Sequence, residues 1–274
     1  MNLEQIIAEY QSLRLDDVLD HKKFSEYALT HHSTTIEGST LTEAETSLLL
    51  DEGITPKGKP LEHSLMVKDH DEALKFVLFS ASTRQPVTIP FIQAINAKVL
   101  KSTGKTYNTP LGTVDAAKGE FRKGNVTAGG YYFPNYDKVE RLTTQLVQHL
   151  QSEMAKDLSI TEKIELSHAA HFDLVSIHPF YDGNGRTSRL LMNYIQAFYQ
   201  LPLGIVHKED RAEYFEALTE ARKKEDINIF QEFMKSQYKK LLQKEIDEFL
   251  KMKKGQSLLP KNRKNNDRGK SLFL

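Results

Sequence analysis

Apolar residues recur at helical spacing along almost the whole chain, and this pattern restricts its fold more than any other feature. Leu142, Leu146 and Leu150, for example, fall on one face of a helix. The same spacing predicts helices at about residues 3–30, 31–37, 42–50, 61–82, 86–100, 137–150, 161–178, 186–198, 208–223 and 226–254. We therefore expect a mainly α fold. Thr42 and Glu45 form a capping-box signature at the start of one of these helices.

One stretch, residues 101–136, breaks the helical pattern. Glycines gather in it, with aromatic and β-branched residues between them. This composition is typical of strands joined by glycine-containing turns, so we expect a single short β-hairpin here.

Composition narrows the class of protein. The chain has 274 residues, enough for one large domain with extensions, and its 37 basic and 37 acidic residues cancel. Balanced charge gives no reason to expect nucleic acid or an anionic membrane as a partner. The absence of cysteine excludes disulfides and thiolate zinc sites. No signal peptide or membrane-spanning stretch is recognisable, so a cytoplasmic protein is expected.

The stretch HPFYDGNGRTSR, from His178 to Arg189, joins two predicted helices. Pro179 disfavours helical geometry at the residue before it, so the imidazole lies at the break. The glycines on either side of Asn184 let the backbone turn, and the next helix begins with free N–H donors. Arg186 lies three residues before the last arginine, so both share one helix face. This arrangement predicts an anion-binding cradle with a base at its edge.

The simpler interpretation of this stretch is an ordinary turn between helices, because Gly and Asn are common turn residues. An ordinary turn would not predict two arginines at a helix start, where positive charge opposes the helix dipole. An anion or a carboxylate beside them would offset that cost, so we favour a binding role.

The stretch resembles the signature of the Fic family, H-x-F-x-[D/E]-G-N-G-R-x-x-R, and every defined position is present between His178 and Arg189. The pattern over about residues 85–235 is similar to the mostly helical core of that family. The resemblance implies a domain that binds ATP and Mg²⁺ and transfers AMP to a protein hydroxyl.

The resemblance also implies a role for each motif position. His178 would be the general base, and its unperturbed pKa near neutrality suits proton removal. Asp182 would hold Mg²⁺, because hard ions prefer oxygen ligands. The backbone of Gly183, Asn184 and Gly185 would form the anion hole for the α- and β-phosphates.

Three further positions complete the motif. Arg186 would neutralise phosphate charge, Arg189 would hold the γ-phosphate, and Phe180 would anchor the loop in the core. Relatives similar to Doc toxins carry Lys where this chain has Gly185, and they act as kinases. The glycine therefore favours AMP transfer.

A second site is predicted at Ser33-Thr-Thr-Ile-Glu37-Gly38. Alone it reads as a helix that ends at glycine. Beside the motif above it resembles the family's inhibitory motif, [S/T]-x-x-x-E-[G/N]. The resemblance implies that Glu37 pairs with Arg189 in place of the γ-phosphate, and that the chain belongs to the N-terminally self-inhibited class. In some relatives this glutamate also supports AMP removal, which stays an alternative role.

A third site is the predicted hairpin, from Gly119 to Pro134. It resembles the family's flap, which aligns the target segment by strand-like pairing. A plain surface hairpin is the alternative. The resemblance implies that the nucleotide and the target face Val126, Thr127, Ala128 and Gly129.

Two aromatic residues downstream, Tyr214 and Phe215, resemble those that relatives place near the adenine. Relatives often follow them with an Asn that contacts the nucleotide. This chain has Arg222 there, so that contact is not expected.

Histidines offer an alternative chemistry. His168 and His171 share a helix face, and with His178 they could form a zinc site. Histidines at helical spacing are more often structural, and zinc would not explain the Asp-Gly-Asn-Gly-Arg loop.

Three regions are therefore expected: an N-terminal helical extension with the inhibitory motif over residues 1–84, a Fic-type core over 85–235, and a C-terminal helix and tail over 236–274. From Lys251 onward the tail has eight Lys/Arg and one acid, a composition typical of solvated chain.

The predicted activity is Mg-dependent transfer of AMP from ATP to a hydroxyl of a target protein, held off by Glu37. Alternatives are a nucleotide-responsive regulatory module, or transfer of another nucleotide-derived group. Self-inhibited relatives are often dimers, so a homodimer is also expected.

Overall fold

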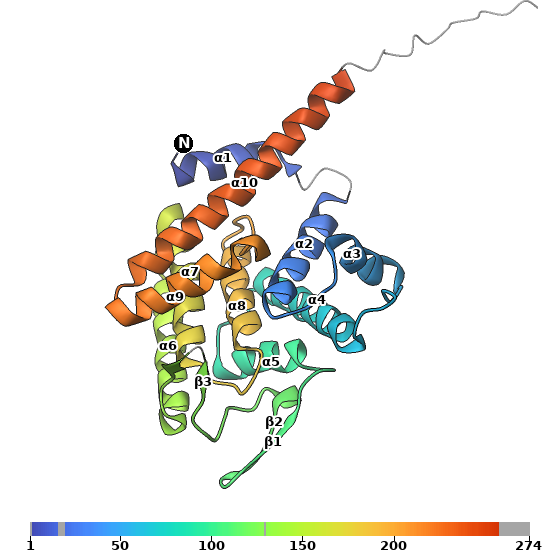
Figure 1. Ribbon diagram of the computed structural model, residues 1–274. Coiled ribbons are helices and arrows are strands. Elements are labelled where there is room, and N and C mark those ends of the chain that lie inside the picture. The colour runs from blue at the N-terminus through green and yellow to red at the C-terminus, as the bar shows by residue number, and fades with distance from the viewer. Residues whose placement is uncertain (1, 16–19, 129, 258–274) are drawn as a thin grey trace, which may run out of the picture.

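The computed structural model describes residues 2–15, 20–128 and 130–257 (Figure 1). Gly129 and most of the predicted basic tail lie outside the described residues. The helices are α1 Leu3–Ser12, α2 His21–Ile36, α3 Glu43–Glu52, α4 Leu61–Ser82, α5 Ile89–Val99, α6 Val139–Met154, α7 Ile160–Ile177, α8 Asn184–Phe198, α9 Arg211–Lys224 and α10 Ile227–Ser257. The strands are β1 Thr106–Thr109, β2 Gly112–Asp115, β3 Thr127–Ala128 and β4 Tyr131–Tyr132. The prediction of a mainly α fold is confirmed.

Local sequence fixes where several helices begin. Asn2, Thr42 and Ser159 each accept a hydrogen bond from the backbone N–H three residues on, and the side chain there bonds back to the cap. Such capping boxes satisfy N–H groups that a helix start leaves free. The capping box predicted at Thr42 is therefore present.

Helix α8 is the centre of the fold. It packs against α7, α4, α5 and α2, and every residue from Arg186 to Gln196 is buried. A helix enclosed on all sides must also satisfy its polar side chains. Asn193 donates to the Gly204 carbonyl at 2.9 Å, and the Gln196 carbonyl oxygen accepts from the Gly204 N–H at 2.7 Å.

The predicted helix over residues 3–30 is wrong, because the chain breaks between α1 and α2. Arg14 and Asp20 have left-handed backbone conformations, with φ of 49° and 64°. Helix α1 packs on α10 and α7, whereas α2 packs on α3, α4 and α8 (Figure 1). The two helices bury their apolar faces in different places, so one straight helix cannot serve both.

The prediction of a single hairpin is also incomplete, because the stretch forms two. In the first, Thr106 pairs with Asp115 and Thr109 with Gly112. In the second, Thr127 pairs with Tyr132 and Ala128 with Tyr131. The second hairpin lies within Gly119–Pro134, which we call the flap.

The N-terminal helices share the main core. Leu29 of α2 and Leu74 and Val77 of α4 belong to the same buried cluster as Leu174 of α7 and Leu191 of α8. Helices α2 and α4 therefore pack directly against the central helices and share their core. Within the described part of the chain, every helix is too short or too polar to cross a membrane.

Candidate active site

His178 ends helix α7 in a left-handed conformation, with φ of 53° and ψ of 58°. Its backbone N–H bonds to the Leu174 carbonyl at 3.0 Å. In the side chain, Nδ1 lies 3.3 Å from the Val175 carbonyl oxygen. A carbonyl oxygen only accepts, so Nδ1 carries the proton and Nε2 keeps its lone pair. The ring is therefore held in the tautomer that a general base requires.

The flap covers this imidazole. The Phe133 ring is stacked on the His178 ring, with centroids 3.8 Å apart and an interplanar angle of 19°. Burial lowers the pKa of His178 to about 4, and the charges of Arg222 and Arg122 act in the same direction. At neutral pH the ring is uncharged and can accept a proton.

Arg122, which belongs to none of the sequence motifs, ties the flap to the end of α7. Its Nε donates to the His178 carbonyl at 2.8 Å and one terminal nitrogen donates to the Gly124 carbonyl at 2.8 Å. The other terminal nitrogen donates to the Pro134 carbonyl. The side chain is 2% exposed, so these carbonyl groups replace its water.

The loop between α7 and α8 is braced from within. The Asn184 side chain accepts from the Phe180 N–H at 3.0 Å and donates to the Phe180 carbonyl at 2.9 Å. From α5, Asn96 donates to the Asp182 carbonyl at 3.0 Å and to the Thr187 hydroxyl at 3.1 Å. Gly183 has φ of 76°, and a Cβ there would lie 2.8 Å from the Asn96 amide nitrogen. The tight fit leaves no room for a side chain at this position, directly before α8.

Asp182 and Arg186 lie together at this helix start. One Asp182 carboxylate oxygen is 3.4 Å from the Arg186 guanidinium, and 53% of the Asp182 side chain is exposed against 3% for Arg186. Mg²⁺ in phosphate-binding sites is often held by one or two carboxylates plus water and phosphate oxygens. An exposed carboxylate beside an anion site fits such an ion.

Arg189 is buried and donates hydrogen bonds to Ser33 of α2 and to Glu37, the residue after α2. It donates to the Glu37 carboxylate at 2.7 Å, to the Ser33 hydroxyl at 2.9 Å and to the Ser33 carbonyl at 2.9 Å. The Ser33 hydroxyl in turn lies 2.8 Å from Nε2 of His70 in α4. The predicted contact between Glu37 and Arg189 is therefore present. His70 is an additional member of this hydrogen-bond network.

The Glu37 carboxylate also lies against the glycine of the cradle. A Cβ on Gly185 would come within 2.4 Å of a Glu37 carboxylate oxygen. Burial alone would raise the pKa of Glu37, but the charges of Arg189, Arg186 and Arg211 outweigh it and lower the pKa. The side chain is thus an anion, placed at the start of α8 where positive charge converges.

Known proteins resemble this chain in sequence and in fold. A model of the Fic/DOC family matches residues 86–196. The chain contains a Fic/DOC-family domain. Curated relatives called Protein adenylyltransferase Fic, from Drosophila willistoni and Drosophila melanogaster, are 33% identical over 214 residues. Each match covers 78% of this chain and 40% of the relative, so the chain spans less than half the length of these relatives.

Solved Fic structures agree with the fold outside the family model. A Fic domain containing signaling protein from Bacteroides thetaiotaomicron superimposes with a TM-score of 0.78 at 25% identity, over 90% of this chain and 97% of that chain. Fic-1 from C. elegans superimposes with a TM-score of 0.72 at 27% identity, over 89% of this chain and 69% of that chain. The resemblance predicted from the motif is confirmed, and it extends to the helices before residue 86.

The remaining predicted site residues lie on α9 and in the flap. Tyr214 is 1% exposed, and its hydroxyl is 3.5 Å from Arg189 and 2.9 Å from His171. Phe215 is 40% exposed at the surface. In the flap, Val126 is partly buried, whereas Thr127 and Ala128 are exposed. The structure brings Tyr214 to the arginine side of the site and leaves the two flap residues open to solvent.

The histidines considered as a zinc alternative make separate contacts. Nδ1 of His168 lies 3.2 Å from the Gln231 side-chain oxygen, and His171 meets the Tyr214 hydroxyl. Both rings are buried in helix packing. Their arrangement fits structural histidines of the Fic domain.

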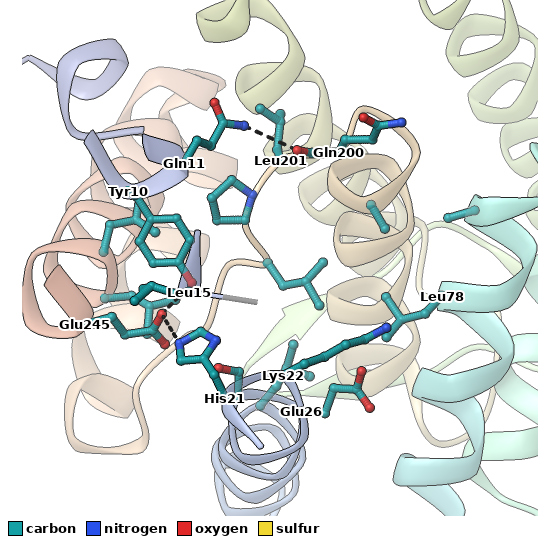
Figure 2. Close-up of a pocket in the computed structure, with 18 of the residues that line it drawn as sticks. Tyr10, Gln11, Leu15, His21, Lys22, Glu26, Leu78, Gln200, Leu201 and Glu245 are labelled. Atoms are coloured by element: carbon teal, nitrogen blue, oxygen red, sulfur yellow. Dashed lines mark hydrogen bonds and ion pairs between the residues drawn. The ribbon is translucent and has the colours of Figure 1, made fainter. Parts of the chain in front are cut away.

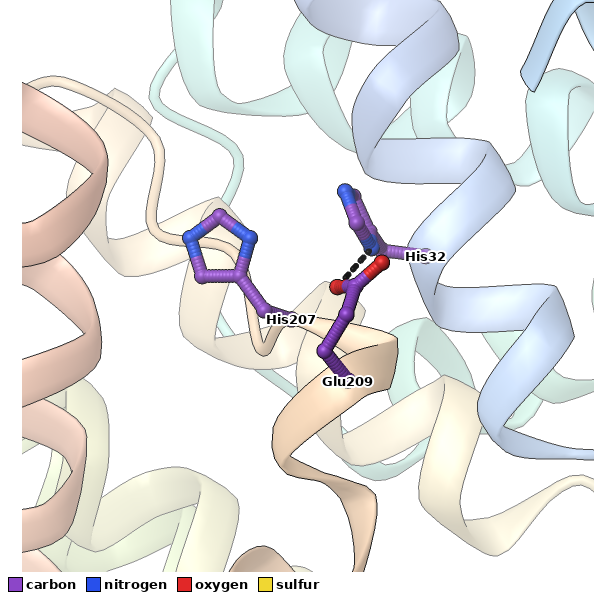
Figure 3. Close-up of side chains that lie close together, drawn as sticks. All are labelled: His32, His207 and Glu209. Carbon is purple, nitrogen blue, oxygen red and sulfur yellow. Dashed lines mark ion pairs between the residues drawn. The ribbon is translucent and has the colours of Figure 1, made fainter. Parts of the chain in front are cut away.

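A second histidine cluster joins α2 to the segment before α9 (Figure 3). His32 and His207 have ring centroids 5.0 Å apart, and Nδ1 of His32 is 3.8 Å from the Glu209 carboxylate. The same Nδ1 accepts the Lys208 N–H at 3.1 Å, so its lone pair is already used. This cluster acts as a contact that holds α2 in place.

A cavity of about 730 Å³ opens between α1, α2, α10 and the end of α8 (Figure 2). Tyr10 donates to the Glu245 carboxylate at 2.6 Å, and His21 lies 3.4 Å from the same carboxylate. The described residues that line it include none of the predicted site residues. The cavity is therefore distinct from the site in front of α8.

Proposed function

We propose that this Fic domain transfers AMP from ATP to a hydroxyl group of a target protein. The observation that carries the proposal is the Glu37 carboxylate, an anion seated on Arg189 and against Gly185. This carboxylate occupies a position that favours negative charge. Gly185 belongs to the same sequence motif as His178, whose neutral imidazole is covered by the flap. The names of the curated relatives support the same activity.

In this proposal Nε2 of His178 takes the proton from the target hydroxyl. The freed oxygen attacks the α-phosphorus of ATP, a P–O bond to the target forms, and the bond to the β-phosphate breaks to release pyrophosphate. The backbone N–H groups at the start of α8 and Arg186 would stabilise the phosphate charge. Asp182 would hold Mg²⁺, which supplies further charge neutralisation when bound.

We infer that Glu37 inhibits the reaction by competing for Arg189. ATP would need this guanidinium for its γ-phosphate, but the carboxylate already accepts a charge-assisted hydrogen bond from it. ATP could then bind only in a pose unsuited to attack. The chain would belong to the N-terminally self-inhibited class of Fic proteins.

The target would meet the flap. Strand β3 pairs with β4 on one side, and no second neighbour is present among the described strands. An extended target segment could add along the exposed Thr127 and Ala128 by strand-like pairing, which presents its hydroxyl to the covered imidazole. Phe215, exposed near the start of α9, would line the adenine side, whereas Tyr214 is buried against Arg189.

The test is labelling with ATP that carries an isotope on the α-phosphate, in the presence of Mg²⁺. Glu37→Gly should increase labelling of the protein itself, or of a cell lysate, by at least ~10-fold, because Arg189 becomes available. Adding His178→Ala to this variant should remove the signal.

Two results would contradict the proposal. Persistent labelling in the double variant would show that His178 is not the base. No labelling by the Glu37→Gly variant, together with ATP binding that changes assembly, would favour a nucleotide-responsive regulatory module. Repeating the assay with UTP tests the choice of donor.

A further inference from the structure

Arg222, near the end of α9, binds the last turn of α7. Its Nε donates to the Ser176 hydroxyl at 3.0 Å, and a terminal nitrogen donates to the Val175 carbonyl at 3.3 Å. This carbonyl is the same one that accepts from Nδ1 of His178. A cation at the carboxyl end of a helix is favourable, because the free carbonyl groups there carry partial negative charge.

The same guanidinium contacts the flap. Its central carbon lies 5.1 Å from the ring centroid of Tyr131 and 5.5 Å from that of Phe133. Both distances are within the range of cation–π attraction. Phe133 is the ring that stacks on His178. Arg222 therefore meets the imidazole's backbone partner and the ring that covers the imidazole.

Three charged side chains act on His178 from the elements packed around it. Arg222 comes from α9, Arg122 from the flap and Glu37 from the end of α2. The two arginines favour the neutral imidazole, and the glutamate opposes them. After burial and the hydrogen bond to Val175, Arg222 is the largest of these influences.

Helix α9 also reaches the inhibitory contact. At its first residue, Nε of Arg211 donates to the Ile36 carbonyl at the end of α2, at 2.8 Å. Further along, Tyr214 contacts Arg189. One rigid helix thus touches α2, Arg189 and the flap in turn.

We propose that Arg222 is a positioning residue that locks the flap aromatics Tyr131 and Phe133 against the end of α7, so that His178 stays covered and oriented. The inference rests on the proposed role of His178 but not on the identity of the target. A planar fork can bond the helix end edge-on while its face meets aromatic rings, which a lysine ammonium cannot do.

The first measurement needs no activity. Histidine ring signals of the full chain would be titrated by NMR, and His178 identified by its loss in a His178→Asn variant. Arg222→Gln should raise the pKa of His178 by roughly 0.5–1 unit and speed amide exchange at Tyr131–Phe133 at least ~10-fold. Lys223→Gln, on the same helix with the same charge change and an exposed side chain, should do neither.

The second measurement uses labelling by the Glu37→Gly variant at several pH values. Adding Arg222→Gln should lower kcat about 10-fold and move the acid limb of the pH–rate profile to higher pH, with the KM for ATP little changed. Arg222→Lys should keep the pH profile but recover only part of kcat.

The outcomes separate the two proposals. An unchanged His178 pKa together with unchanged flap exchange in Arg222→Gln would overturn the positioning role. A shifted pKa and faster flap exchange, with no labelling even in Glu37→Gly, would support the positioning role and contradict AMP transfer.

Discussion

At the residue scale, the neutral state of His178 sets the expected pH dependence. A general base must be unprotonated, and its pKa is lowered from 6.5 to about 4. As the proposed base, His178 would therefore stay competent at pH values where an ordinary histidine is already protonated. Labelling by Glu37→Gly should be nearly flat from pH 8 down to about 5.5 and fall only toward pH 4.

The check is the initial labelling rate across this range, with circular dichroism at each pH to confirm that the protein remains folded. A labelling rate that has already fallen to half near pH 6.5 would show that the imidazole is not shielded as the structure indicates. Because Glu37 raises the pKa of His178, its removal should shift the acid limb of the profile to lower pH.

The motif residues were predictable one by one, and the contact of Glu37 with Arg189 followed from the two motifs together. Arg122 and Asn96 were not. Both act mainly through hydrogen bonds to backbone carbonyl groups of distant segments. Such contacts require only that an oxygen be nearby in space, so they leave no spacing or pairing in the sequence. An arginine inside a glycine-rich stretch with aromatic residues was the one available sign.

At the scale of elements, the flap depends on Arg122 as its anchor. Arg122→Ala would leave the carbonyl groups of His178, Gly124 and Pro134 without this donor. Losing buried partners of a charged group should lower the free energy of unfolding by roughly 2–4 kcal/mol. Urea denaturation of the variant and the parent measures the difference.

A matched control lies one residue away. Lys123 is exposed, and its ammonium makes a single long contact of 3.4 Å to the Thr113 carbonyl. Lys123→Ala should change the free energy of unfolding by less than ~0.5 kcal/mol. Equal effects of the two substitutions would mean that Arg122 does not anchor the flap.

Helix positions were well predicted at α3, which begins with a capping box, and at α4, which matches the predicted residues 61–82 without a side-chain cap. The break between α1 and α2 was missed because apolar spacing continues through it, and only the choice of packing partners separates the two helices. The hairpin of β1 and β2 was missed for a different reason. Its strands are short and mostly polar, so alternation gave no signal, and its turn uses Pro110 and Leu111.

At the scale of the molecule, buried histidines predict sensitivity to acid. Burial is the first cause of a lowered pKa at each of His31, His32, His70, His168, His171, His178 and His207. Below pH 6.5 the histidines of the unfolded chain bind protons, whereas the buried histidines of the folded state stay neutral. The free energy of unfolding therefore falls as pH falls. Each such histidine contributes a slope of up to ~1.4 kcal/mol per pH unit.

Asp173 works in the opposite direction, because burial raises its pKa to about 6, but the histidines outnumber it. The free energy of unfolding should therefore be lower at pH 5.5 than at pH 7. Because several histidines contribute, the difference should be on the order of several kcal/mol. Urea titrations at the two pH values measure it. Equal or greater stability at pH 5.5 would contradict the buried, neutral state of these rings.

Helix α2 carries Ser33 and ends at Ile36, directly before Glu37, and it also packs against α8. Its Leu29 belongs to the main core, and Ile36 packs with Tyr214 and Met192 in a second cluster. Cutting α2 away would expose both clusters to water along with Arg189. In the proposed self-inhibition, α2 is therefore not a segment that could detach: activation would have to move the Glu37 carboxylate and leave the helix that precedes it in place.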